Sequence, residues 1–156
     1  MDNNIKKEHW ENVFTTKQET EVSWFQPYPK TSIEFVKLFN LPFDANIIDI
    51  GGGDSHFVDA LLEEGYQNIW VLDISENALS RAKKRLGEKA NKVNWVVSDI
   101  IDFNPTVTFD FWHDRAAFHF LTTEENINKY VGIAEKGIKT NGILVLGTFS
   151  ETGPTK

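Results

Sequence analysis

From residue 45 onward, short apolar runs alternate with segments in which apolar residues recur every three or four positions. The runs are bounded by glycine or polar residues and predict strands at 46–50, 69–72, 93–97, 109–112 and 142–148. The periodic segments predict amphipathic helices at 56–64, 75–86 and 122–134. This alternation is typical of an open α/β sheet that is covered by helices on both faces.

Residues at the expected ends of the helices agree with this interpretation. Gly65 stands where a left-handed C-cap is expected, and Gly87 ends the next periodic segment. Ser75 is a suitable N-cap, and Thr122 with Glu125 has the spacing of a capping box. Periodicity and capping residues therefore predict the same helices.

The N-terminal part, 1–44, has a different character, because it is rich in aromatic residues and proline. Helical spacing is seen around Trp10 and again from Ile33. We expect a helical cover here and a ligand-binding core over 45–156. A length of 156 residues is typical of one domain, so both parts are assigned to a single domain over 1–156.

Acidic residues follow three of the predicted strands. Asp49 closes the first strand, Asp73 ends the second and Asp99 follows the third. Each of them, taken singly, is also typical of a turn or a helix cap. Ligands of open α/β sheets bind beyond the carboxyl ends of the strands, so the three carboxylates are expected to line one crevice. Clustered like charges favour a cationic, phosphate-free ligand that also carries a ribose and an amine.

The first turn consists of Gly51, Gly52 and Gly53, which allow a sharp turn and a close approach of the main chain to a ligand. The fingerprint of dinucleotide-binding sheets requires a further glycine where this chain has His56. The lysine of a phosphate-binding P-loop is also absent from this turn. A P-loop is therefore excluded, and a nicotinamide oxidoreductase is disfavoured.

These features resemble the class I S-adenosylmethionine-dependent methyltransferases. The resemblance is carried by Asp49-Ile-Gly51-Gly-Gly53, Asp73 and Asp99-Ile100, in that order. Two further segments, 21–26 and 112–122, resemble small bacterial methyltransferases of unassigned acceptor that are related to some protein-lysine methyltransferases. The resemblance implies a Rossmann-like three-layer α/β sandwich with a mostly parallel sheet of order 3-2-1-4-5. It also implies S-adenosyl-L-methionine as cofactor, with S-adenosyl-L-homocysteine as product.

The resemblance also implies a role for each matching residue. The first turn would hold the methionine part of the cofactor, Asp73 the ribose hydroxyls and Asp99 the adenine amine. Trp24 would close over the methionine end. The expected cofactor-binding residues are Trp24, Asp49, Gly51, Gly52, Gly53, Asp73, Ile74, Asp99 and Ile100.

Residues after the fourth predicted strand would border the methyl acceptor. His113 and Asp114 are expected to position the acceptor or to act as a general base, which is needed only if the acceptor arrives protonated. His119 is a further candidate, with simple packing as the alternative. Arg115 would bind a carboxylate of the acceptor or pair with Asp114. We expect no metal site.

Two departures from the family pattern bear on these expectations. Ser55 stands where the family usually has its last glycine. The family usually continues with a helix and an antiparallel pair of strands, and these strands 6 and 7 are missing here. We therefore expect a C-terminally truncated chain, or a partner that covers an otherwise open apolar edge at 143–149.

Composition narrows the expected partners. The net charge of −7, from 23 acidic and 16 basic residues, disfavours a nucleic acid. No apolar run approaches the ~18 residues of a membrane span. The absence of cysteine fits a cytoplasmic location and excludes a cysteine nucleophile.

The expected function is therefore methyl transfer from S-adenosylmethionine to a small molecule or a protein side chain, by in-line displacement. The alternative is a module that binds the cofactor without transferring its methyl group. The sequence leaves the oligomeric state open.

Overall fold

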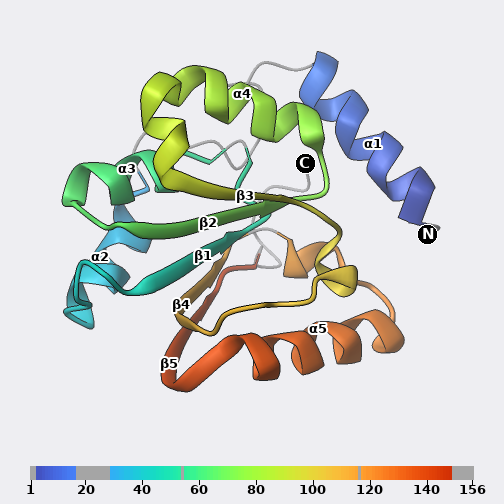
Figure 1. Ribbon diagram of the computed structural model, residues 1–156. Helices are drawn as coiled ribbons and strands as arrows, with labels where there is room; N and C mark the ends of the chain where they lie inside the picture. The colour runs from blue at the N-terminus through green and yellow to red at the C-terminus, as the bar shows by residue number, and fades with distance from the viewer. Residues whose placement is uncertain (1–2, 17–28, 54, 116, 149–156) are drawn as a thin grey trace.

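A parallel sheet forms the centre of the protein, in a computed structural model that describes residues 3–16, 29–53, 55–115 and 117–148. Its strands lie in the order β3-β2-β1-β4-β5 (Figure 1). They are β1 (Asn46–Ile50), β2 (Asn68–Asp73), β3 (Val93–Val97), β4 (Phe109–Asp114) and β5 (Ile138–Leu146). The predicted α/β class and strand order are confirmed.

Helices cover both faces of this sheet. They are α1 (Asn3–Thr16), α2 (Lys30–Leu38), α3 (Phe57–Glu64), α4 (Glu76–Leu86) and α5 (Glu124–Gly137), with short 3₁₀ helices η2 (Gly87–Lys92), η3 (Ile100–Asp102) and η4 (Phe118–Phe120). In Figure 1, α3 and α4 lie above the sheet, α5 lies below it, and α1 lies beside α4. None of the described helices is long and apolar enough to cross a membrane.

The two faces of the sheet bury separate apolar clusters, because side chains alternate along each strand. Ile47 of β1 packs with α2, α3 and α4, in a cluster that includes Val36, Phe57, Leu61, Leu79 and Phe111. Ile48 and Ile50 pack on the opposite face, in a cluster that includes Leu72, Trp112, Tyr130 and Ala134. Asp49 lies two residues after Ile47 on the same face of β1, and it therefore points to the α2–α3 side.

Most of the predicted caps are confirmed. Gly65 ends α3 with a φ of 101°, and the Ser75 hydroxyl accepts a hydrogen bond from the Ala78 N–H at the start of α4. The predicted cap of α5 is wrong by one residue. The hydroxyl that accepts the Asn126 N–H belongs to Thr123, because the helix begins at Glu124.

The fifth strand differs most from its prediction. It begins at Ile138 instead of residue 142, and Asn141 adopts a φ of 68° where its register with β4 is irregular. Leu144 and Leu146 on this strand are 47% and 39% exposed. Within the described residues β5 pairs only with β4 and forms an edge of the sheet.

Candidate functional site

A pocket lies at the carboxyl ends of β1, β2 and β3. It is lined by Lys6, Trp10, Ile50, Gly51, Leu72, Asp73, Ile74, Ser98, Asp99, Ile100, Ala117 and Phe120. The space inside it totals about 600 Å³, which includes the part open to solvent. The structure thus brings together Gly51, Asp73, Ile74, Asp99 and Ile100 of the expected set.

Asp73 joins the first turn to the start of α4. Its Oδ2 accepts a hydrogen bond from the Gly53 N–H at 3.0 Å, and its Oδ1 accepts one from the Ser75 N–H at 2.9 Å. A Cβ on Gly53 would lie only 2.8 Å from Asp73 Oδ2, so this approach requires glycine. Each carboxylate oxygen can accept a further hydrogen bond, so this structural role leaves Asp73 able to bind hydroxyl groups.

The other two glycines of the turn are required for different reasons. Gly51 has a φ of 69°, and its N–H donates to the Leu72 carbonyl at 2.7 Å. A Cβ on Gly52 would overlap the carboxylate of Asp49. The first turn is therefore fitted around two buried carboxylates, Asp49 and Asp73.

Asp99 lines the same pocket and stands directly before the first residue of η3. Its Oδ1 accepts a hydrogen bond from the Ile101 N–H, and Lys6 Nζ lies 3.2 Å from its Oδ2. Trp10, one turn further along α1, packs edge-on against Phe120 with ring centroids 5.1 Å apart. Sequence analysis missed the role of α1 at the pocket, although the i,i+4 spacing of Lys6 and Trp10 places both on one helical face.

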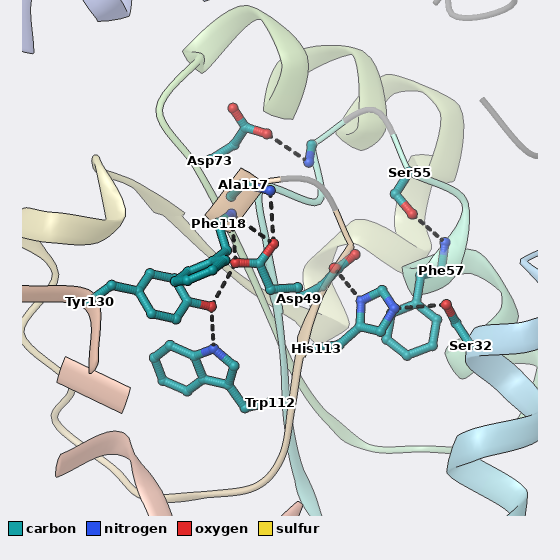
Figure 2. Close-up of polar contacts among 12 residues, drawn as sticks. Ser32, Asp49, Ser55, Phe57, Asp73, Trp112, His113, Ala117, Phe118 and Tyr130 are labelled. Carbon is teal, nitrogen blue, oxygen red and sulfur yellow. Dashed lines mark hydrogen bonds and ion pairs between the residues drawn. The ribbon is translucent and has the colours of Figure 1, made fainter. Parts of the chain in front are cut away.

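A second group of buried polar residues lies where β1 and β4 end (Figure 2). Asp49 and His113 are register partners on these parallel strands, so both point to the same face. His113 Nδ1 lies 2.8 Å from Asp49 Oδ1, and its Nε2 lies 2.7 Å from the hydroxyl of Ser32 on α2. The three side chains form a continuous hydrogen-bonded chain.

The other oxygen of Asp49, Oδ2, is buried and has no hydrogen-bond partner within the part of the chain that the structure describes. A buried carboxylate oxygen without a donor costs free energy, so such an atom needs an explanation. Asp49 itself does not line the pocket described above, although Ile50 and Gly51 beside it do.

Asp114 points to the opposite face of the sheet and is surrounded by donors of the protein. Its carboxylate accepts hydrogen bonds from the Tyr130 hydroxyl at 2.6 Å and from the N–H groups of Ala117 and Phe118. Trp112 Nε1–H donates in turn to the Tyr130 hydroxyl at 3.0 Å. Burial raises the pKa of Asp114, and the hydrogen bonds only partly offset this effect.

The remaining predicted residues have separate positions. The Ser55 hydroxyl accepts the Phe57 N–H at the start of α3, which explains a polar residue in place of the usual glycine. Arg115 is half-buried, and burial lowers its pKa despite the nearby charge of Asp49. His119 is exposed on η4, and Trp24 lies outside the described residues.

Comparisons with known proteins agree with this geometry. Residues 47–142 match a family model described as a methyltransferase domain. The chain is 27% identical over 107 residues to malonyl-[acyl-carrier protein] O-methyltransferase 2 of Ilyobacter polytropus, covering 68% of this chain. It is 28% identical over 167 residues to EEF1A lysine methyltransferase 2 of Mus musculus, covering 94% of this chain.

The fold is shared with a solved S-adenosylmethionine-dependent methyltransferase from Clostridium acetobutylicum, with a TM-score of 0.66 at 20% identity, over 93% of this chain and 57% of that one. The matches span 40% of the Ilyobacter relative and 66% of the mouse relative. The family model covers well over half of the chain and includes the strands that carry the pocket. The protein therefore belongs to the methyltransferase-domain family.

Proposed function

We propose that this protein is a class I S-adenosylmethionine-dependent methyltransferase that methylates a small molecule or a protein side chain. The observation that carries the proposal is the pocket at the ends of β1–β3, which is lined by the buried Asp73 and Asp99 together. In this proposal Asp73 accepts hydrogen bonds from the ribose hydroxyls, and Asp99 accepts one from the adenine amine. Ile74 and Ile100, which also line the pocket, contact the nucleoside.

The residues of the first turn fit the other end of this cofactor. The unpaired Oδ2 of Asp49 is an acceptor for the ammonium group of the methionine part, and Gly51–Gly53 allow a ligand to approach the main chain. A pyrophosphate would bring negative charge towards three carboxylates, which opposes a dinucleotide. When bound, S-adenosylmethionine would supply a methyl group on a sulfonium. A lone pair of the acceptor would bond to the methyl carbon in line as the carbon–sulfur bond breaks, with S-adenosylhomocysteine as the leaving group.

The acceptor-side residues have their polar atoms occupied by the protein. Both ring nitrogens of His113 and both carboxylate oxygens of Asp114 are engaged by buried groups. We propose that they hold the site in shape and do not remove a proton from the acceptor. An acceptor that reaches the site already deprotonated needs no general base.

The relatives support the reaction class and leave the acceptor open, since one is an acyl-carrier-protein O-methyltransferase and the other a lysine methyltransferase. We further propose that residues 1–156 form one domain, with 1–44 as helical cover and 45–156 as cofactor-binding core. Trp24 closing over the methionine end and a cytoplasmic location belong to the same proposal.

Calorimetric titration with S-adenosylhomocysteine tests the cofactor assignment. We expect saturable binding that weakens about tenfold in Asp73→Asn and Asp99→Asn, because each change weakens a charge-assisted hydrogen bond of about 1.5 kcal/mol. Glu88→Gln, an exposed charge change far along the chain, is the matched control and should bind as the unmodified protein does. No saturable binding, or equal binding by all variants, would exclude the proposed site.

Transfer of a labelled methyl group from S-adenosylmethionine to a panel of proteins and small molecules tests the activity itself. A labelled product that forms more slowly in Asp73→Asn, at a cofactor concentration that does not saturate the unmodified protein, supports methyl transfer. Cofactor binding without any labelled product would favour the alternative of a binding module.

A further inference from the structure

We infer that His113, braced by Ser32, is a positioning residue that directs Asp49 towards the primary ammonium group of the cofactor. This inference rests on the proposed function and adds two residues to its binding site. Neither contacts the pocket at the nucleoside end, so both act through Asp49.

The sheet places Asp49 beside His113. Asp49 and His113 are opposite each other on adjacent parallel strands, and both point towards the α2–α3 face. The register already brings the two side chains together, and His113 Nδ1 lies 2.8 Å from Asp49 Oδ1. One of the two carboxylate oxygens is fixed by this contact.

The imidazole ring has a fixed orientation. Its Nε2 lies 2.7 Å from the Ser32 hydroxyl, and its face stacks on Phe57 with ring centroids 4.1 Å apart and 28° between the planes. His113, Ser32 and Phe57 are at most 5% exposed. The ring is thus held by α2 and α3 together and cannot turn away from Asp49 without losing buried contacts.

These contacts also assign the protons. With a proton on Nδ1, the imidazole donates to Asp49 Oδ1 and accepts the Ser32 hydroxyl hydrogen at Nε2, which satisfies both nitrogens. With Oδ1 engaged in this way, only Oδ2 of Asp49 is left without a donor in the described residues. His113 thus fixes Oδ1 of Asp49, and Oδ2 is left to bind a ligand.

The surroundings of Asp49 Oδ2 indicate which group of the cofactor it binds. Oδ2 lies against Gly52, where a side chain would overlap the carboxylate, and the neighbouring Gly51 lines the proposed cofactor site. A buried, charged acceptor that lacks a donor is best satisfied by a cationic donor. In S-adenosylmethionine the amino-acid part carries such a group, a primary ammonium, whereas the nucleoside carries none.

Two ligands that differ in the amino-acid part provide the test. S-Adenosylhomocysteine carries the ammonium group, and 5′-methylthioadenosine has the same thio-nucleoside without the amino-acid chain. Both affinities are measured calorimetrically for the unmodified chain, His113→Asn and His113→Gln. The asparagine amide nitrogen replaces Nδ1 and keeps a donor for Asp49, whereas the glutamine amide replaces Nε2 and leaves Asp49 without one.

We expect His113→Gln to weaken S-adenosylhomocysteine about tenfold while 5′-methylthioadenosine binds as before, which matches the loss of one charge-assisted interaction. His113→Asn should stay within about threefold of the unmodified protein for both ligands. Both variants lose the stacking on Phe57, so a purely structural role would affect them, and both ligands, alike. That equal effect would overturn the inference.

Ser32→Ala decides the question if the His113 variants do not fold, because it removes only the hydroxyl. It should weaken S-adenosylhomocysteine about threefold and leave 5′-methylthioadenosine unchanged. A parallel loss for both ligands would contradict the role given to Ser32 and His113. If the unmodified chain binds neither ligand, the proposed function fails. If it binds both but the variants do not discriminate, the proposed function stands and the positioning role fails.

Discussion

Two buried carboxylates at the ends of neighbouring strands have opposite environments. Asp114, at the end of β4, accepts hydrogen bonds from a tyrosine hydroxyl and two main-chain N–H groups. Asp49, in β1, accepts one from His113 and leaves its other oxygen unpaired within the described residues. Figure 2 shows their partners apart from each other, with Tyr130 and Trp112 on the left and His113 and Ser32 on the right.

We interpret this difference as that between a carboxylate that stabilises the fold and one that we propose binds a ligand. Asp114 accepts hydrogen bonds from Tyr130, Ala117 and Phe118, and these only partly offset the cost of burying its charge. Asp49 Oδ1 is bound by His113, whereas its Oδ2 has no hydrogen-bond donor within the described residues, although the charge of Arg115 is nearby. We therefore expect changes at Asp114 to act mainly on stability and changes at Asp49 to act mainly on binding.

The largest expected effect is the loss of stability in Asp114→Ala. The substitution leaves the Tyr130 hydroxyl and the Ala117 and Phe118 N–H groups without their acceptor, at about 1 kcal/mol or more each. The free energy of unfolding, measured by denaturant titration, should fall by about 3 kcal/mol. Asp49→Ala, which leaves one donor unpaired, is the matched control, and an equal loss at both positions would remove the distinction.

Asp49→Asn should have the second-largest effect, on binding instead of stability. The amide keeps the size of the side chain and removes the charge, so S-adenosylhomocysteine should bind about tenfold more weakly or worse. The free energy of unfolding should change by less than about 1 kcal/mol, because Oδ2 makes no hydrogen bond to the described protein. Unchanged affinity together with a large loss of stability would assign Asp49 a structural role.

Sequence reasoning found both carboxylates and missed what distinguishes them. Apolar periodicity predicted the strands, and strand ends located Asp49, Asp73 and Asp99 at one edge of the sheet. Whether Asp49 and His113 lie opposite each other depends on the register between β1 and β4, which periodicity does not determine.

Contacts between residues that are distant in the chain could not be predicted from the sequence for the same reason. Ser32 lies in α2, whose predicted role was only to cover the core, and its contact with His113 exists only after α2 packs on α3. Lys6 reaches Asp99 from α1 in the same way. Local rules predict elements and caps, whereas these pairs arise from the packing of complete elements.

The pH dependence of the free energy of unfolding tests the environment of Asp114 directly. Burial raises the folded-state pKa of Asp114 above its ordinary 3.8, so the folded protein binds more protons than the unfolded chain between 3.8 and the raised value. In that window stability falls as pH rises, by at most about 1.4 kcal/mol per pH unit for a single group. Above the raised pKa this contribution is constant.

Denaturant titration of the unmodified protein and Asp114→Asn over a range of pH isolates this group, since all other titrations are shared. The stability of the unmodified protein relative to the variant should increase as pH falls through the window. A difference that is independent of pH, or that has the opposite sign, would contradict a raised pKa.

The smallest expected effect concerns Lys6, whose ammonium lies 3.2 Å from Asp99 at the nucleoside end of the pocket. Partly exposed ion pairs contribute up to about 1 kcal/mol, and the adenine amine would compete with Lys6 for this carboxylate. Lys6→Ala should therefore tighten S-adenosylhomocysteine by up to about fivefold in calorimetric titration. Lys7→Ala, an exposed neighbour on the same helix, is the charge-matched control and should bind as before. If Lys6→Ala instead weakened binding, Lys6 would contribute to ligand binding and would not compete with the adenine amine for Asp99.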